Sequence, residues 1–153
     1  MKNSSKPLRL IHCTNEIGEG GGIATINGYF NRFLNRDIFD PGLAGSGQDK
    51  PFSDSIKYLG FRPDVHRIYK GADLLINLSR KESFGLVAIE AMASGCLVVG
   101  SDDGGMSEVI SDSANGWLVD GKNRTLVRST INNAIQTRQT SKWNTMRLSA
   151  VKP

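Results

Sequence analysis

From residue 56 to residue 136, short apolar stretches alternate with stretches of helical spacing, and this alternation constrains the fold more than any other feature of the sequence. The order is strand, helix, strand, helix, strand, helix, strand, helix, over residues 56–60, 63–72, 73–79, 84–95, 97–100, 106–110, 116–119 and 123–136. Short apolar strands that alternate with helices are typical of a parallel sheet. We therefore predict an α/β fold with a Rossmann-like parallel sheet and helices on both faces.

The N-terminal third has a different organisation. Residues 8–14 read as a short buried strand, "EIGEGGG" follows as a glycine loop, and residues 23–34 have helical spacing. The stretch after this helix is rich in Pro, Gly and Asp, and only residues 42–45 suggest a strand. We expect four segments: a strand, loop and helix, an irregular joint, a main α/β domain and a basic polar tail, at residues 1–36, 37–55, 56–136 and 137–153.

The charge distribution leaves two interpretations of the tail open. Residues 121–153 contain Lys and Arg but no Asp or Glu, and Trp143 lies between Lys142 and Arg147. The segment is either a solvated helix end or a peripheral contact with the inner face of an anionic membrane. No run approaches the roughly 18 apolar residues of a membrane span. Cys13 and Cys96 lie in apolar stretches and read as reduced thiols, so we expect a cytoplasmic protein.

Glu90 is a carboxylate inside the apolar run "KESFGLVAIEAMASG". Its neighbours at helical spacing are Leu86, Val87 and Ala93, so we expect its side chain to be buried. A buried carboxylate needs a cationic side chain or a hydrogen-bonding ligand. An internal salt bridge and a ligand contact are therefore the two alternatives.

The start of the same helix favours the ligand. The free amides of Phe84, Gly85 and Leu86 form an anion site at a helix N-terminus, and glycine lets a ligand approach the backbone. Helical side chains lean toward the N-terminus, so the carboxylate of Glu90 reaches toward these amides. The pair suggests a nucleotide, with diphosphate on the amides and ribose hydroxyls on Glu90. Glu82 either faces the same ligand or is an ordinary acid at a helix start.

These residues resemble a known family. "ESFGLVAIE", "AMASG", "LVV", "GG", "SEVI" and "NGWLV" follow one another as in the C-terminal domain of retaining glycosyltransferases of family 4, which have the GT-B fold. The resemblance covers residues 57–119. Residues 9–34, with Gly21 and Gly22 in the glycine loop, are similar to the first strand, loop and helix of the family's N-terminal domain.

The resemblance implies a role for each matching residue. Glu82 would lie at the transferred sugar and act in catalysis, and Glu90 would bind the donor ribose. The donor-binding set implied by the resemblance is Phe84, Gly85, Leu86, Glu90, Gly104, Gly105, Gly21 and Gly22. The donor would be a UDP- or GDP-sugar and the acceptor a glycan or a lipid-linked molecule, and no metal or other cofactor would be required.

The chain departs from the family pattern in three respects. Most of the N-terminal domain is missing, no stretch matches the basic Arg and Lys pair that neutralises the diphosphate, and neither His12 nor His66 lies in the motif of the active-site histidine. A weak transferase is one interpretation. The alternative is a non-catalytic nucleotide-sugar-binding module or degenerate fragment that needs a second chain or another copy of itself.

Two other classes of function fit the sequence less well than the transferase. A nicotinamide-dependent oxidoreductase could also begin with a strand, a glycine loop and a helix. In "GEGGGIAT", however, Ile23 stands where the dinucleotide-binding fingerprint requires Gly or Ala. The sequence contains no helix-turn-helix, zinc-binding or aromatic RNA-binding motif, so we expect no nucleic-acid partner.

Overall fold

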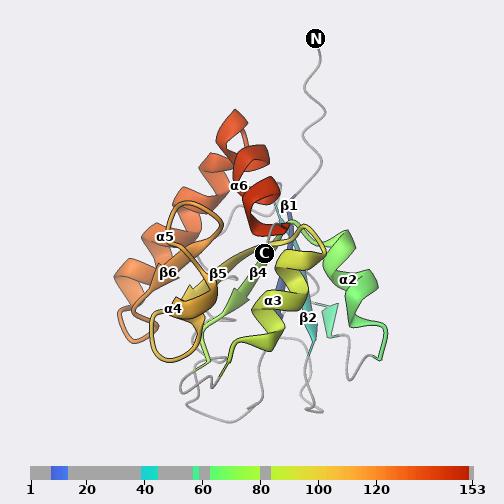
Figure 1. Cartoon of the computed structure of the whole chain (residues 1–153), viewed down its shortest axis with the longest axis horizontal. Coiled ribbons are helices and arrows are strands. Elements are labelled where there is room, and N and C mark those ends of the chain that lie inside the picture. The colour runs from blue at the N-terminus through green and yellow to red at the C-terminus, as the bar shows by residue number, and fades with distance from the viewer. Residues whose placement is uncertain (1–7, 14–38, 45–56, 59–62, 80–83, 152–153) are drawn as a thin grey trace.

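The computed structural model describes residues 8–13, 39–44, 57–58, 63–79 and 84–151, and they form one parallel sheet with helices packed on it (Figure 1). The six strands run in the order β3-β2-β1-β4-β5-β6. Their bounds are β1 Leu8–Cys13, β2 Phe39–Ala44, β3 Lys57–Tyr58, β4 Leu74–Asn77, β5 Leu97–Ser101 and β6 Trp117–Val119. Every strand pair is parallel, which confirms the predicted α/β Rossmann-like fold class.

β1 occupies the centre of this sheet. It pairs with β2 on one side, from Leu8 opposite Phe39 onward, and with β4 on the other, where Leu10 lies opposite Leu74. The strand order changes direction between β1 and β4, as in Rossmann folds. Residues 8–13 therefore share a sheet with the strands of residues 56–136.

The interpretation of residues 37–55 as an irregular joint is wrong for residues 39–44, which form β2. The proline content of "FDPGLA" argued against a strand, but β3 pairs only with Gly42 and Leu43 of β2. Pro41 lies before this pairing begins, so its missing amide hydrogen interrupts no bond to β3.

The helices follow the predicted alternation. They are α2 Val65–Gly71, α3 Leu86–Ala93, α4 Met106–Val109, α5 Arg124–Thr137 and α6 Ser141–Val151. α2, α3 and α4 lie on the face of the sheet turned toward the viewer in Figure 1, and α5 runs beside β6. Asn123 is the N-cap of α5. Its side-chain oxygen accepts a hydrogen bond from the Leu126 amide at 3.1 Å.

The core lies in the central strands. All four residues of β4 and all five of β5 are buried. Because successive side chains of a strand point to opposite faces, this burial means that both faces of the central sheet are covered. Cys96 is also buried, as the sequence predicts.

The expected basic polar tail is a docked helix instead. α6 buries Trp143, Met146 and Ala150, and the Trp143 ring lies 6.1 Å from that of Trp117. Trp143 is 4% exposed and is therefore not available as an anchor at a membrane surface. The apolar positions of α6 are separated by polar residues, so the sequence of the segment alone looks like a solvated helix end.

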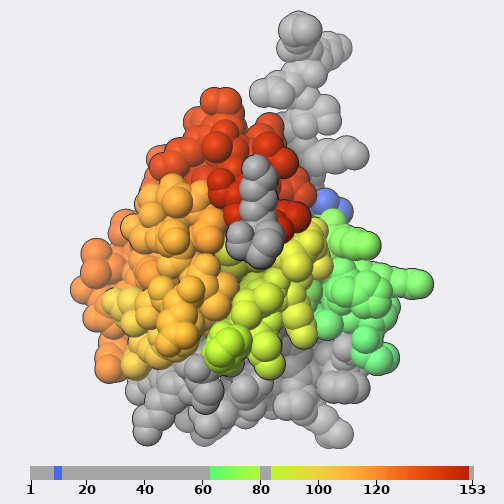
Figure 2. All heavy atoms as spheres, in the orientation of Figure 1, coloured from blue at the N-terminus to red at the C-terminus, as the bar shows by residue number. Residues whose placement is uncertain are grey.

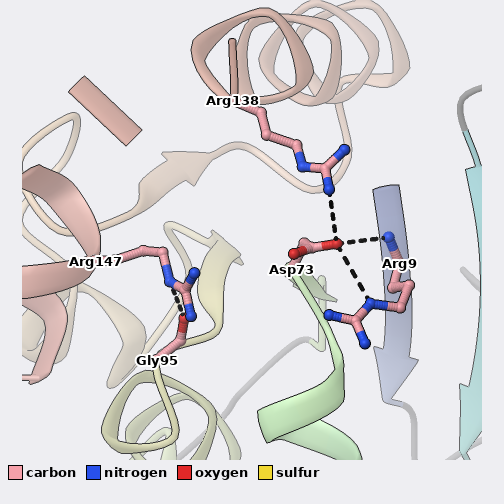
Figure 3. Close-up of polar contacts among 5 residues, drawn as sticks. All are labelled: Arg9, Asp73, Gly95, Arg138 and Arg147. Atoms are coloured by element: carbon pink, nitrogen blue, oxygen red, sulfur yellow. Dashed lines mark hydrogen bonds and ion pairs between the residues drawn. The ribbon is translucent and has the colours of Figure 1, made fainter. Parts of the chain in front are cut away.

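Three polar contacts lie at the amino edge of the sheet (Figure 3). The Asp73 carboxylate accepts a hydrogen bond from the Arg9 amide at 2.9 Å and lies 3.4 Å from Nη2 of Arg138 at the end of α5. On α6, Nε of Arg147 donates to the Gly95 carbonyl at 2.7 Å. These contacts join β1, β4, α5 and α6 at the end of the sheet opposite the α3 and α4 N-termini.

Candidate functional site

Two glycine turns lie at the carboxyl edge of the sheet, each at the start of a helix. Gly85 precedes α3 with a φ of +67°, and Gly104 lies one residue before the N-cap of α4 with a φ of +91°. Both values belong to the left-handed region, which glycine adopts without steric cost. In open α/β sheets ligands bind at this edge, so the turns mark the candidate site.

The N-terminus of α3 has amides available to a ligand. Gly85 has no side chain that could cap the helix, and its carbonyl accepts from the amides of Ala88 and Ile89. Within the part of the chain that the structure describes, nothing accepts a hydrogen bond from the amides of Leu86 and Val87. Unpaired amides at the positive end of a helix attract an anion.

The expected burial of Glu90 is wrong. Its side chain is exposed, and so are those of Ala93 and Leu86, the latter at 60%. α3 buries Ala88, Ala91 and Met92 instead, and Figure 2 shows its outer face at the surface of the molecule. Nearly every position of this helix is apolar, so the apolar spacing did not identify the buried face.

The alternative of an internal salt bridge for Glu90 also finds no support. Among residues 63–79 and 84–151, no cationic group forms an ion pair with its carboxylate. Glu90 lies one turn after Leu86 and on the same face, so its carboxylate is accessible to a molecule bound at the helix N-terminus.

The second turn contacts the first. Met106, the first residue of α4, is fully buried, and its sulfur lies 3.4 Å from the position that a Cβ on Gly85 would take. The carbonyl of Gly104 accepts a hydrogen bond from the Ser107 hydroxyl at 3.0 Å, which holds the turn closed. The turn at Gly85 and the turn of Gly104 and Gly105 therefore lie in one region of the structure.

A polar hollow of about 340 Å³ opens at the same edge. It lies at the ends of β5 and β6 and is lined by Ser101, Asp102, Asp103, Asp120, Gly121 and Lys122. None of these six residues is among the predicted site residues. The sequence does contain a signal for them, because polar residues directly after two neighbouring parallel strands meet at one edge of the sheet.

Several predicted site residues cannot be placed. Glu82, Gly21 and Gly22 lie outside the described residues. Phe84 is described and is 60% exposed beside Gly85. His66 is exposed on α2. Within the described ranges, no group of three His, Cys, Asp or Glu side chains is arranged to hold a metal ion.

The family is decided by a match to residues 48–145, which fit the family described as "Glycosyl transferases group 1". The chain belongs to this family. The group 1 glycosyl transferase match contains the whole of α3, α4 and both glycine turns. It also extends into α6, so the helix that the sequence suggested was a polar tail lies partly inside the family region.

Relatives within the group 1 glycosyl transferases align with part of the chain. A D-inositol 3-phosphate glycosyltransferase of Corynebacterium kroppenstedtii is 40% identical over 93 residues, which cover 52% of this chain and 21% of that protein. The enzyme of the same name from Mycobacterium sp. strain KMS is 48% identical over 60 residues, which cover 39% of this chain and 14% of that protein. The chain thus spans about a fifth of the length of the first curated relatives it matches.

Solved structures share the fold of this group 1 glycosyl transferase chain. HepE of Anabaena, crystallised with UDP-glucose, has a TM-score of 0.79 at 23% identity, covering 95% of this chain and 43% of HepE. The C-terminal domain of the group 1 glycosyl transferase LpcC from Francisella tularensis has a TM-score of 0.71 at 23% identity. This match covers 95% of the present chain and 84% of the LpcC domain. The fold is accordingly that of a GT-B C-terminal domain.

In the part of the chain that the structure describes, no helix has both the length and the apolar character needed to cross a membrane.

Proposed function

We propose that this chain is the donor-binding half of a retaining glycosyltransferase of the family 4 type, which transfers a sugar from a UDP- or GDP-sugar to a glycan or a lipid-linked acceptor. The observation that carries the proposal is the N-terminus of α3, where the left-handed turn at Gly85 leaves amides available and Glu90 is accessible one turn later. This arrangement suits a nucleoside diphosphate, and we propose that the donor binds without a metal or other cofactor.

The donor diphosphate binds at the start of α3. The amides of Phe84, Gly85 and Leu86 hold its oxygens, and the positive end of the helix dipole adds to the attraction. Glu90 accepts hydrogen bonds from the ribose hydroxyls, and Gly104 and Gly105 allow the donor to approach a second stretch of backbone. The structure of HepE in complex with UDP-glucose, on a fold with a TM-score of 0.79, supports the choice of donor class.

Catalysis rests on Glu82 and on protein beyond the donor site. By the family resemblance, Glu82 lies at the transferred sugar, and the turn of Gly21 and Gly22 approaches the donor from the other side. The basic pair that neutralises the diphosphate has no match in this sequence. Without such charge stabilisation the transition state loses several kcal/mol. We propose that a second chain or another copy completes the acceptor side.

The cytoplasm, with a peripheral contact at the inner membrane face, is the proposed location. α5 and α6 contain basic residues and no acidic ones, and Leu148 and Val151 of α6 are 68% and 51% exposed. Co-sedimentation with vesicles containing anionic lipid tests the contact, with Leu148→Ser as the comparison variant. If the wild type and Leu148→Ser pelleted to the same extent, and anionic vesicles pelleted no more protein than neutral ones, the proposed membrane contact would be contradicted.

Isothermal titration with UDP and with GDP tests donor binding. The wild type should bind one of them, and Glu90→Ala should abolish binding while leaving the melting temperature unchanged. Glu108→Ala is the matched control, because Glu108 is also an exposed glutamate on a helix at this edge. A folded wild type that binds neither nucleotide would overturn the proposal.

An assay with radiolabelled nucleotide sugar separates a transferase from a non-catalytic module. Transfer that disappears in Glu82→Ala supports catalysis by this chain. Nucleotide binding without turnover above the level of Glu82→Ala would instead favour the binding module.

A further inference from the structure

Two glycines at the carboxyl edge, Gly85 and Gly100, contact one buried side chain, that of Met106. Met106 is the first residue of α4 and directly follows Gly104 and Gly105. Its exposed fraction is 0%, although its backbone lies at the rim of the site. A long, flexible thioether is thus held entirely inside the protein beneath the two glycine turns.

The Met106 side chain packs against two glycines, and at Gly100 it shares this position with Cδ1 of Ile110, which lies 2.8 Å from the position of a Cβ. Its sulfur lies 3.4 Å from the position of a Cβ on Gly85, and the same sulfur lies 3.4 Å from the position of a Cβ on Gly100. Its α-carbon is 3.8 Å from the Gly85 position, and its β-carbon is 3.6 Å from the Gly100 position. Met106 therefore packs between the turn before α3 and the end of β5.

The turn at Gly85 packs against α4. A glycine with a φ of +67° has access to many other conformations, so its left-handed state must be maintained by its surroundings. The nearest atoms to the Gly85 side-chain position all belong to α4, namely Sδ and Cα of Met106 and Cγ2 of Val109. Since α4 is only four residues long, its own hydrogen bonds contribute little rigidity.

We propose that Met106 is a positioning residue for the donor. By packing against Gly85, it orients the amides of Phe84, Gly85 and Leu86. It also keeps that turn next to Gly104 and Gly105, which directly precede Met106 in the chain. The inference rests on the proposed function, in which those amides hold the diphosphate. Met106 itself does not touch the donor, because it is buried.

A substitution series can separate positioning from general stability. Met106→Ala removes the atoms that support Gly85 and leaves a cavity. Met106→Leu keeps most of the volume and the apolar character. Met146→Ala is the matched control, because Met146 is 1% exposed on α6, at the opposite edge of the sheet, and its truncation costs core packing away from the donor site.

Two measurements are made on each variant. The first is hydrogen exchange of the ligand-free protein at the amides of Ala88 and Ile89, which donate to the Gly85 carbonyl. We expect Met106→Ala to accelerate exchange of these two amides at least tenfold relative to Met146→Ala, and Met106→Leu to restore protection. Equal exchange of the two amides in the two alanine variants would overturn the positioning role, whether or not the protein binds a nucleotide.

The second measurement is the affinity for UDP or GDP by titration, at a temperature where all variants are folded. Met106→Ala should weaken binding at least tenfold, with Met106→Leu and Met146→Ala close to the wild type. Unchanged affinity in Met106→Ala would overturn the inference, while the wild type continues to support the proposed function. Absence of binding in the folded wild type would contradict the proposed function, and the role of Met106 in donor positioning would fall with it.

Discussion

At the scale of single residues, conformation and exposure matter more than residue type. Gly85 and Gly95 both have positive φ, at +67° and +81°, and each ends or begins α3. Glu90, which looked like a buried charge in the sequence, is exposed. The carboxylate of Glu90 therefore has no burial penalty to offset. Gly85 and Gly95, in contrast, have backbone conformations that other residues rarely adopt.

Substitution of Gly85 tests this constraint. Gly85→Ala should destabilise the protein by about 1–2 kcal/mol, because an alanine in the left-handed region is strained. Gly71→Ala is the control: Gly71 lies within α2, without a positive φ, and the nearest atom to its side-chain position is 3.8 Å away. It should be neutral or stabilising. Urea denaturation measures both, and an equal effect of the two changes would contradict the prediction.

Glu90→Ala gives a second prediction at this scale. Exposed side chains without ion pairs usually change stability by less than about 0.5 kcal/mol when substituted. We therefore expect the free energy of unfolding of Glu90→Ala to match that of the wild type in the absence of nucleotide. A clear loss of stability would show that Glu90 has a structural role.

At the scale of elements, α6 shows how a segment of polar appearance becomes part of the core. Trp143 and Met146 are buried, and the Trp143 ring packs on that of Trp117 in β6. Arg147 adds a hydrogen bond to the carbonyl of Gly95, where α3 ends. The helix thus connects β6 with the loop between α3 and β5.

Truncation of Trp143 measures this contribution. Trp143→Ala should cost about 3–5 kcal/mol, because it removes a large buried side chain. Leu148→Ala on the same helix should cost little, since Leu148 is 68% exposed. Chemical denaturation of both variants gives the comparison. Similar midpoints would mean that α6 behaves as the solvated tail that its composition suggested.

At the scale of the whole molecule, the chain order of the strands differs from their order in space. β1 comes first in the chain and third in the sheet, between β2 and β4. Asp73 connects β1 with the end of α5: its carboxylate accepts hydrogen bonds from the backbone amide of Arg9 in β1 and from the side chain of Arg138, which follows α5. The Arg9 side chain is 56% exposed, so its ion pair at 3.7 Å contributes little beside the backbone contact.

Loss of the Asp73 carboxylate should therefore weaken the whole fold. Asp73→Ala removes an exposed hydrogen bond from the Arg9 amide to a carboxylate and should cost about 1 kcal/mol, because water can replace the lost acceptor. Asp102→Ala, at an exposed position, is the comparison and should have little effect on stability. Thermal unfolding at low and high salt would check the origin of the effect. A loss that disappears at high salt would point to the ion pairs rather than to the amide contact.

Removal of residues 1–13 tests whether β1 is an integral strand. We expect the shortened chain to lose cooperative unfolding, because β2 and β4 would both lose their neighbour and expose unpaired edges. A shortened chain that still unfolded cooperatively would support the interpretation of residues 1–36 as a separable segment.

The sequence by itself determined the elements from residue 56 to residue 136, because apolar periodicity and the glycines between the elements depend only on local order. The motifs around Glu82 and Glu90 likewise indicate a glycosyltransferase, and residues 48–145 match the group 1 family. Only the tertiary structure decided which face of α3 is buried, since nearly all its residues are apolar, and which strand lies in the middle of the sheet. The same holds for α6 and Met106, because their burial depends on partners distant in the chain, and local sequence carries no record of such partners.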